Sequence, residues 1–339
     1  MSERVMDSAA GPNLGALGAQ VSTTAERGRV LQRLALVDVV FRRATFSCAL
    51  LVLILLGGVI LSLIQGSLPA LGAFGLGFVT SQSWNPVTEK FGGGPAIYGT
   101  LVTSAIALVI AAPVGVGIAV FLTELCPIAL RRPIGIAIEL LAGIPSIIYG
   151  IWGLFILAPF LQTYVQPWLI NTFKEVPGLN LLFTGPPYGI GMLTAGVILG
   201  VMVLPYVASV CRDVFETVPV VLKEAAFGIG CTTTEVVRHV VIPYTAVGVI
   251  GAIMLGLGRA LGETMAVTFV IGNAHKIATS ILAPGTTISA TIANEFTEAV
   301  GDLYTSSLVL LGLILFVITF VELSIARFLH MSVERKGGG

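Results

Sequence analysis

Residues 224–263 begin Glu224-Ala225-Ala226-Phe227-Gly228-Ile229-Gly230, pass through Val240-Val241-Ile242-Pro243, and continue as an apolar run containing Gly258-Arg259-Ala260-Leu261-Gly262-Glu263. The first part is polar enough to lie in water as a docking element. The second part places two opposite charges inside a run long enough to cross hydrocarbon. The stretch therefore predicts a membrane protein with a docking element in the aqueous phase and a charged site within a transmembrane span. The simplest such protein is a transporter subunit.

The composition of the whole chain is that of a polytopic membrane protein. Of its 339 residues, 55% are hydrophobic and only 11% are charged, and the mean hydropathy is +0.97, whereas soluble domains carry about 25% charged residues. The net charge is zero, so nothing indicates a nucleic-acid partner. The four cysteines have neither metal-site nor disulfide spacing: Cys48, Cys126, Cys211 and Cys231.

Six hydrophobic stretches predict an all-α fold with six transmembrane helices. We expect a largely flexible cytoplasmic tail at 1–45, with an interfacial helix near residues 30–41, and a first helix at 46–65. An outer connection at 66–96 would lead to a core of five helices at 97–326, and a cytoplasmic tail at 327–339 would follow. The expected core spans are 98–122, 134–158, 189–210, 245–272 and 303–326, with the polar loop at 211–243.

The basic residues give the orientation. Fourteen of the eighteen Lys and Arg fall in the tails and loops on one side, three fall on the other side, and the last is Arg259. The positive-inside rule therefore places both termini in the cytoplasm, and an even number of spans agrees with this.

The loop at 211–243 is the longest expected cytoplasmic connection between spans. Its sequence predicts a helix, a glycine turn and a second helix, with Pro243 at the start of the next span. Thr232 and Glu235 have the spacing of a capping box at the start of the second helix. Such a hairpin can insert into the groove of a partner or simply lie on the surface, and spacing alone leaves both open.

The loop then shows a more specific pattern: Glu-Ala-Ala, three residues, Gly, nine residues, and hydrophobic-x-hydrophobic-Pro. This pattern resembles the loop of permease subunits in bacterial ABC importers, with Val240 and Ile242 standing where that family usually has Ile and Leu. The resemblance implies a coupling helix that sits in a cleft of a cytoplasmic ATPase. The matching positions are Glu224, Ala225, Ala226, Gly230, Val240, Ile242 and Pro243.

Further motifs between residues 46 and 330 are similar to the C-type permease subunits of high-affinity phosphate importers. These motifs are Ile97–Leu101, Arg132–Leu141, Ile144–Ser146, Gly228–Thr233 and Gly258–Val267. The resemblance implies the transmembrane domain of a type I ABC importer in the bacterial inner membrane, which moves phosphate by alternating access without an enzymatic activity or cofactor of its own. The implied partners are an A-type permease subunit, an ATPase dimer and an extracytoplasmic phosphate-binding protein.

Arg259 and Glu263 stand four residues apart, which places them on one face of a helix. They can form a buried ion pair that fixes packing, or they can line the path of an anion, since a guanidinium presents a fork of donors to an oxyanion. The resemblance favours the path. Glu139 either partners Arg259 on this path or is a carboxylate near a helix end. Further polar side chains line a path or bond to their own backbone: Ser146, Tyr149, Thr264 and Thr268.

No nucleotide-binding glycine loop and no metalloprotease or hydrolase motif occurs in the sequence. The three histidines, His239, His275 and His330, are scattered, and we expect them in solvated loops. Two alternatives remain. The chain could carry another oxyanion, such as sulfate or molybdate, or it could be a membrane signalling or scaffold component of an importer.

Overall fold

The computed structural model describes the backbone of residues 14–337 and the side chains of residues 37–328 and 331. The predicted all-α fold is confirmed, since the described residues form helices and a single isolated bridge between Asn85 and Lys90. The helices are α1 (Leu14–Phe74), α2 (Gly77–Thr80), α3 (Gly94–Val120), η1 (Phe121–Leu125), α4 (Ile128–Ala142), α5 (Ser146–Trp152), η2 (Gly153–Leu157), α6 (Ala158–Phe160), η3 (Leu161–Val165), α7 (Gln166–Phe173), α8 (Leu179–Leu182), α9 (Met192–Glu216), α10 (Val220–Gly228), α11 (Thr233–Val236), η4 (Val237–Val241), α12 (Ile242–Leu261), α13 (Met265–Thr268), α14 (Ile288–Glu295) and α15 (Asp302–Gly337).

Six helical segments within residues 14–337 are long and apolar enough to cross a membrane, as the sequence predicts. They are Val37–Phe74, Gly94–Leu125, Ser146–Phe173, Met192–Glu216, Thr233–Leu261 and Asp302–Phe328. The chain divides into two compact units, residues 1–62 and 63–339.

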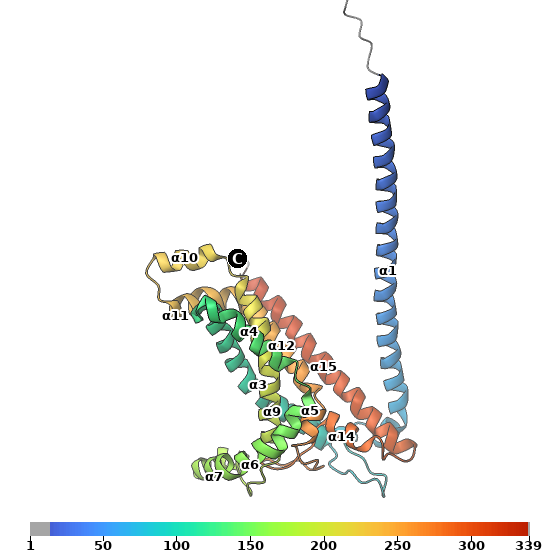
Figure 1. The fold of residues 1–339 in the computed structure, drawn as a ribbon. Helices are drawn as coiled ribbons and strands as arrows, with labels where there is room; N and C mark the ends of the chain where they lie inside the picture. Colours follow the sequence, from blue (N-terminus) through green and yellow to red (C-terminus); the bar gives the residue numbers. More distant parts are fainter. Residues whose placement is uncertain (1–13, 338–339) are drawn as a thin grey trace, which may run out of the picture. The chain divides into compact units, whose positions relative to one another are not determined.

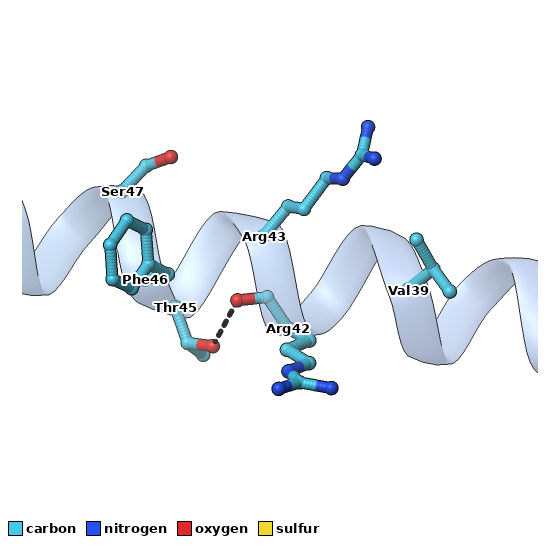
Figure 2. Close-up of a pocket in the computed structure, with 6 residues that line it drawn as sticks. All are labelled: Val39, Arg42, Arg43, Thr45, Phe46 and Ser47. Atoms are coloured by element: carbon cyan, nitrogen blue, oxygen red, sulfur yellow. Dashed lines mark hydrogen bonds between the residues drawn. The ribbon is translucent and has the colours of Figure 1, made fainter.

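The first unit contains the N-terminal part of α1. We expected a flexible tail before residue 46, but the helix already begins at Leu14, because the stretch is rich in good helix formers and contains no proline. Residues 1–13 lie outside the described part. In Figure 2, Arg42 and Arg43 extend to different sides of the helix, and the Thr45 hydroxyl donates to the carbonyl oxygen of Arg42 at 3.0 Å. The hollow drawn there is lined by this helix alone, so we assign no site to it.

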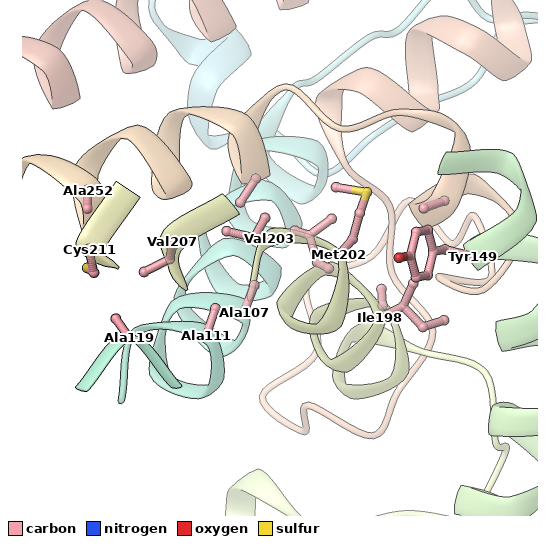
Figure 3. Close-up of a cluster of buried hydrophobic side chains, with 14 of the residues drawn as sticks. Ala107, Ala111, Ala119, Tyr149, Ile198, Met202, Val203, Val207, Cys211 and Ala252 are labelled. Carbon is pink, nitrogen blue, oxygen red and sulfur yellow. The ribbon is translucent and has the colours of Figure 1, made fainter. Parts of the chain in front are cut away.

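Helix α9 lies at the centre of the second unit, between α3, α4 and α12. Figure 3 shows small side chains of α3, such as Ala107 and Ala111, opposite Val203 and Val207 of α9. Gly196 of α9 packs closely against α3, because a Cβ atom at this position would lie only 2.6 Å from Cβ of Ile106. Small residues therefore bring the helices of this core close together.

The first span is longer than the sequence suggested, because α1 continues past residue 65 to Phe74. Pro69 lies inside the helix, and the Ala70 amide donates to Oγ of Ser306 at 2.9 Å. The Ser306 hydroxyl of α15 thus provides a partner for the amide that directly follows the proline. The expected outer connection at 66–96 thus begins as a continuation of the helix.

The third span is shifted along the chain. We expected it at 134–158, but α4 ends at Ala142, and the helix that is long enough to cross the membrane runs from Ser146 to Phe173. Gly143 and Pro145 separate the two segments, as the break in the sequence indicated. Pro159 does not end the new segment because it follows a π-helical turn at the start of α6, where a missing amide costs little.

Glu295, at the end of α14, is bonded to three side chains that come from different parts of the sequence. Its carboxylate accepts hydrogen bonds from Nε1 of Trp84 at 2.5 Å and from the Tyr304 hydroxyl at 2.5 Å, and it lies 2.8 Å from Nε2 of His275. The Trp84 and His275 rings are stacked with centroids 5.1 Å apart. The expectation of a solvated loop histidine is therefore wrong for His275, because its ring is enclosed by the indole and the carboxylate.

This cluster predicts a loss of stability in acid. Burial opposes ionisation of Glu295, but the hydrogen bonds from His275, Tyr304 and Trp84 outweigh it and lower the pKa of the carboxyl group. A depressed pKa stabilises the fold above the pKa of the unfolded chain, about 4.3, and this stabilisation is lost as pH falls through the folded value. We expect Glu295→Gln to lower the free energy of unfolding of the detergent-solubilised protein by about 1–3 kcal/mol at pH 7. Its thermal midpoint should fall accordingly.

The measurement is a thermal unfolding series between neutral and acidic pH, with Glu298→Gln as the control. That control removes the same charge from an exposed position in the turn that follows α14. The difference between wild type and Glu295→Gln should shrink on acidification. A constant difference at every pH, or an equal effect of Glu298→Gln, would contradict the assignment.

Candidate functional site

The docking loop has the predicted helix, turn and helix. Helix α10 ends at Gly228, Gly230 adopts φ +93°, and α11 begins at Thr233. The capping box is confirmed, because Thr232 and Glu235 exchange side-chain-to-backbone hydrogen bonds. Pro243 occupies the first turn of α12, where its missing amide is harmless. Figure 1 shows α10 and α11 at the same end of the second unit as the C-terminal end of α15.

Helix α10 presents apolar side chains to its surroundings. Ile229, just after the helix, is 84% exposed, Val221 is 73% exposed, and the carboxylate-bearing Glu224 is also exposed. Ala226 of the same helix is buried. Of the other motif positions, Ala225, Gly230, Ile242 and Pro243 are exposed and Val240 is half-buried. Apolar groups gathered on a short exposed helix are typical of a surface that inserts into a groove.

An ion pair holds this helix against the end of the second span. Nζ of Lys223 lies 2.5 Å from Oε1 of Glu124 in η1, and both side chains are largely buried. Val236 and Val241 are buried and pack into the core formed by α9 and α12. The loop is therefore fixed to the transmembrane core at η1 and at the start of α12.

The backbone around Arg259 and Glu263 differs from the expected continuous helix. The fifth span was expected to continue to residue 272, with Arg259 and Glu263 on one helical face, but α12 ends at Leu261. Glu263 lies after the break, and its Oε1 accepts a hydrogen bond from the amide of Ala266 at 3.3 Å in the first turn of α13. The carboxylate thus caps the new helix, which explains why the ladder does not continue.

Arg259 has no acidic partner among the described residues. It is exposed, it lies in the last turn of α12, and it forms no ion pair with any of them. It stands roughly 26 Å along the helix from Ile242, within a helical segment that is apolar enough to cross a membrane. The structure therefore does not contain the ion pair with Glu263 that was one of the two alternatives, and the guanidinium is exposed.

Glu139 lies elsewhere. Its Oε1 is 2.9 Å from Nη2 of Arg212, near the C-terminal end of α9, and its side chain is 50% exposed. The structure brings Glu139 to Arg212 and not to Arg259, which favours the alternative of a carboxylate near a helix end. Arg212 also contacts Asp213 at 3.1 Å, so this group links α4 to α9.

Several hydroxyl groups that could have lined a path are satisfied locally. The Tyr149 hydroxyl donates to the carbonyl oxygen of Leu141 at 2.8 Å, and Thr268 donates to that of Thr264 at 2.8 Å. The Thr264 hydroxyl is 3.4 Å from the carbonyl oxygen of Gly262. These bonds support the backbone interpretation of the polar residues.

Glu322 is a further charged residue of the membrane domain that belongs to none of the sequence motifs. This carboxylate lies inside the last span and is only 8% exposed. Its position within an apolar run could have identified it from the sequence, because burying an ionisable side chain in a membrane span costs free energy.

The sequence matches known proteins over most of its length. Residues 111–335 match the family described as "Binding-protein-dependent transport system inner membrane component". A phosphate transport system permease protein PstC of Mesorhizobium japonicum is 68% identical and aligns over 92% of this chain and 95% of its own length. The protein of that name in Pasteurella multocida is 54% identical, over 93% and 98%.

Two solved structures share the fold at low sequence identity. The inward-facing methionine ABC transporter MetNI has a TM-score of 0.50 and 20% identity, covering 73% of this chain and 94% of its own. A bacterial ABC transporter involved in alginate import has a TM-score of 0.50 and 18% identity, covering 82% and 95%.

Proposed function

This chain belongs to the family of binding-protein-dependent transport system inner membrane components, and from this premise we infer that it is the membrane-spanning permease subunit of a phosphate ABC importer. It is a multi-pass protein of the bacterial inner membrane and a transport subunit, not an enzyme. It works as one component among the subunits of such a transporter. The relatives named as phosphate permeases align over nearly the full chain, so the inference rests on a match along its whole length.

The exposed Arg259, unpaired among the described residues, is the observation that carries the proposed phosphate path. A guanidinium stays charged at cellular pH, and its planar fork fits the oxygens of a tetrahedral anion. The negative end of the α12 dipole lies beside it, so the cation is stabilised without a carboxylate that would compete with phosphate. Glu263 supports this arrangement by capping α13, which keeps the helix break open next to Arg259.

The proposed drive comes from an ATPase on the cytoplasmic side. ATP-dependent closure of an ATPase dimer would pull on α10 through Glu224 and the exposed apolar side chains. The Lys223–Glu124 pair and the α11–η4 segment would pass this movement to the spans. An A-type permease subunit would complete the path, and an extracytoplasmic phosphate-binding protein would deliver the anion.

The substrate is tested by uptake of radiolabelled phosphate in cells that lack their own importer and express this chain with its companion subunits. We expect unlabelled phosphate in excess to abolish uptake of the label, and sulfate or molybdate at the same concentration to leave it unchanged. Competition by sulfate or molybdate equal to that of phosphate would favour the other oxyanion function. Cells that express the companion subunits without this chain should show only background uptake, and full uptake by those cells would favour a scaffold role.

A further inference from the structure

Glu322 of α15 is a buried carboxylate without a partner among the described residues. It is 8% exposed, and neither of its carboxylate oxygens has a hydrogen-bond partner within that part of the chain. Oγ of Ser104 on α3 is also buried and unpartnered among the described atoms, and its residue is 2% exposed. Two orphaned polar groups on different helices therefore lie in one region of the membrane domain.

These two groups line the same groove. The cavity has a volume of about 370 Å³ and lies between α3, α12 and α15. Apart from Glu322 and Ser104, its lining side chains are apolar, and Leu101 and Val321 at its rim are 48% and 49% exposed. The groove thus opens outward from the second unit, with an acidic group at its floor and an apolar rim.

Glu322 lies at the depth of the charged site but does not belong to it. Its Oε2 is 3.5 Å from the position that a Cβ atom on Gly258 would take. Arg259 is the next residue of α12, about 100° further around the helix, and no ion pair joins it to Glu322 within the described residues. The described residues therefore supply neither a counter-ion nor a hydrogen-bond donor to the Glu322 carboxyl group.

A carboxylate buried in hydrocarbon is expensive unless a cation or a set of donors compensates for it. Acyl chains filling the groove would leave both oxygens bare. Among the basic residues that a second copy of this chain would bring in its described spans, Arg212 is already paired with Glu139, and the proposed function commits Arg259 to the anion path. A basic side chain of a different membrane subunit satisfies the charge and the hydroxyl together.

We propose that the groove between α3, α12 and α15 receives a transmembrane helix of the paired permease subunit, which inserts a basic side chain between the Glu322 carboxylate and the Ser104 hydroxyl. The proposal rests on the assembly with a second permease that the proposed function includes. The cation would donate to both carboxylate oxygens and to the hydroxyl oxygen, and the apolar rim would pack against the rest of the inserted helix. Glu322 is then an assembly determinant, distinct from the anion site at Arg259.

The test uses the full complex, purified through a tag on this chain from cells that also express the companion subunits. Glu322→Gln should reduce the retained second permease by about tenfold or more, because the buried cation of the partner loses its counter-ion. Glu322→Lys should abolish retention. Leu323→Gln is the matched control, since it places the same amide on the neighbouring exposed position of α15, and it should leave retention unchanged.

A photo-crosslinking residue at Val321 gives a second readout that does not depend on the stability of the Glu322 variants. In the wild-type complex it should attach to a span of the second permease next to a basic residue, and an acidic replacement of that residue should restore retention by Glu322→Lys. Retention of the second permease by Glu322→Gln and Glu322→Lys at the wild-type level, or crosslinks to lipid alone, would overturn the proposal. Failure of the wild type to retain any second permease would instead contradict the proposed assembly itself.

Discussion

Replacing Arg259 with glutamine is expected to reduce phosphate uptake by about tenfold or more while the importer still assembles. Hydrogen bonds to a charged group contribute about 1.5–3 kcal/mol, and every 1.4 kcal/mol corresponds to about tenfold. Arg259 is exposed and forms no ion pair with any described residue. Its replacement therefore deprives no described carboxylate of a counter-ion. The loss should therefore occur in transport and not in folding.

The measurement is radiolabelled phosphate uptake, accompanied by a blot for the assembled complex. Arg327→Gln is the control, because it removes the same charge from an exposed position near the cytoplasmic end of α15, and it should transport normally. Arg259→Lys should retain part of the activity, since it keeps the charge but loses the fork. Normal uptake by Arg259→Gln would remove this residue from the path, and loss of assembly would show that the guanidinium has a packing role.

Glu263 and Arg259 together show which features of the charged site are predictable from the sequence. Spacing and composition identified both charges and the span that carries them. They did not predict the break after Leu261, because an apolar run containing Gly262 is compatible with a continuous helix. The break depends on a local hydrogen bond, from the Ala266 amide to Glu263, whose alternative is an ordinary helical bond of similar energy.

The limits of the spans depend in the same way on tertiary contacts. The first helix was expected to end at residue 65, but Gly66 packs against Val309 and the helix continues to Phe74. The docking loop, in contrast, was predicted well, because a capping box, a glycine with positive φ and an initiating proline are local signals. The partners of Glu139 and Glu295 were not predictable, since each carboxylate meets its partner on a different element.

The second large effect is expected at Gly230, where replacement by valine should disconnect the ATPase. The residue adopts φ +93°, a conformation that costs a side chain with a Cβ atom about 1–2 kcal/mol, and more for a β-branched residue. No atom lies within 4 Å of the position of the new Cβ, so the effect acts through the backbone turn and not through a clash. The turn sets the angle of α10, and the exposed Ile229 would no longer fit the proposed ATPase cleft.

Gly228 offers a matched control only two residues away. A Cβ atom added there would also meet open space, but its φ is ordinary and it ends α10, so Gly228→Ala should bind the ATPase normally. Gly230→Val and Glu224→Ala should both lose co-purification of the ATPase and phosphate-stimulated ATP hydrolysis, while the spans remain inserted. Equal retention of the ATPase by Gly230→Val and Gly228→Ala would show that α10 is a surface hairpin, because the strained turn would then have no consequence for a partner.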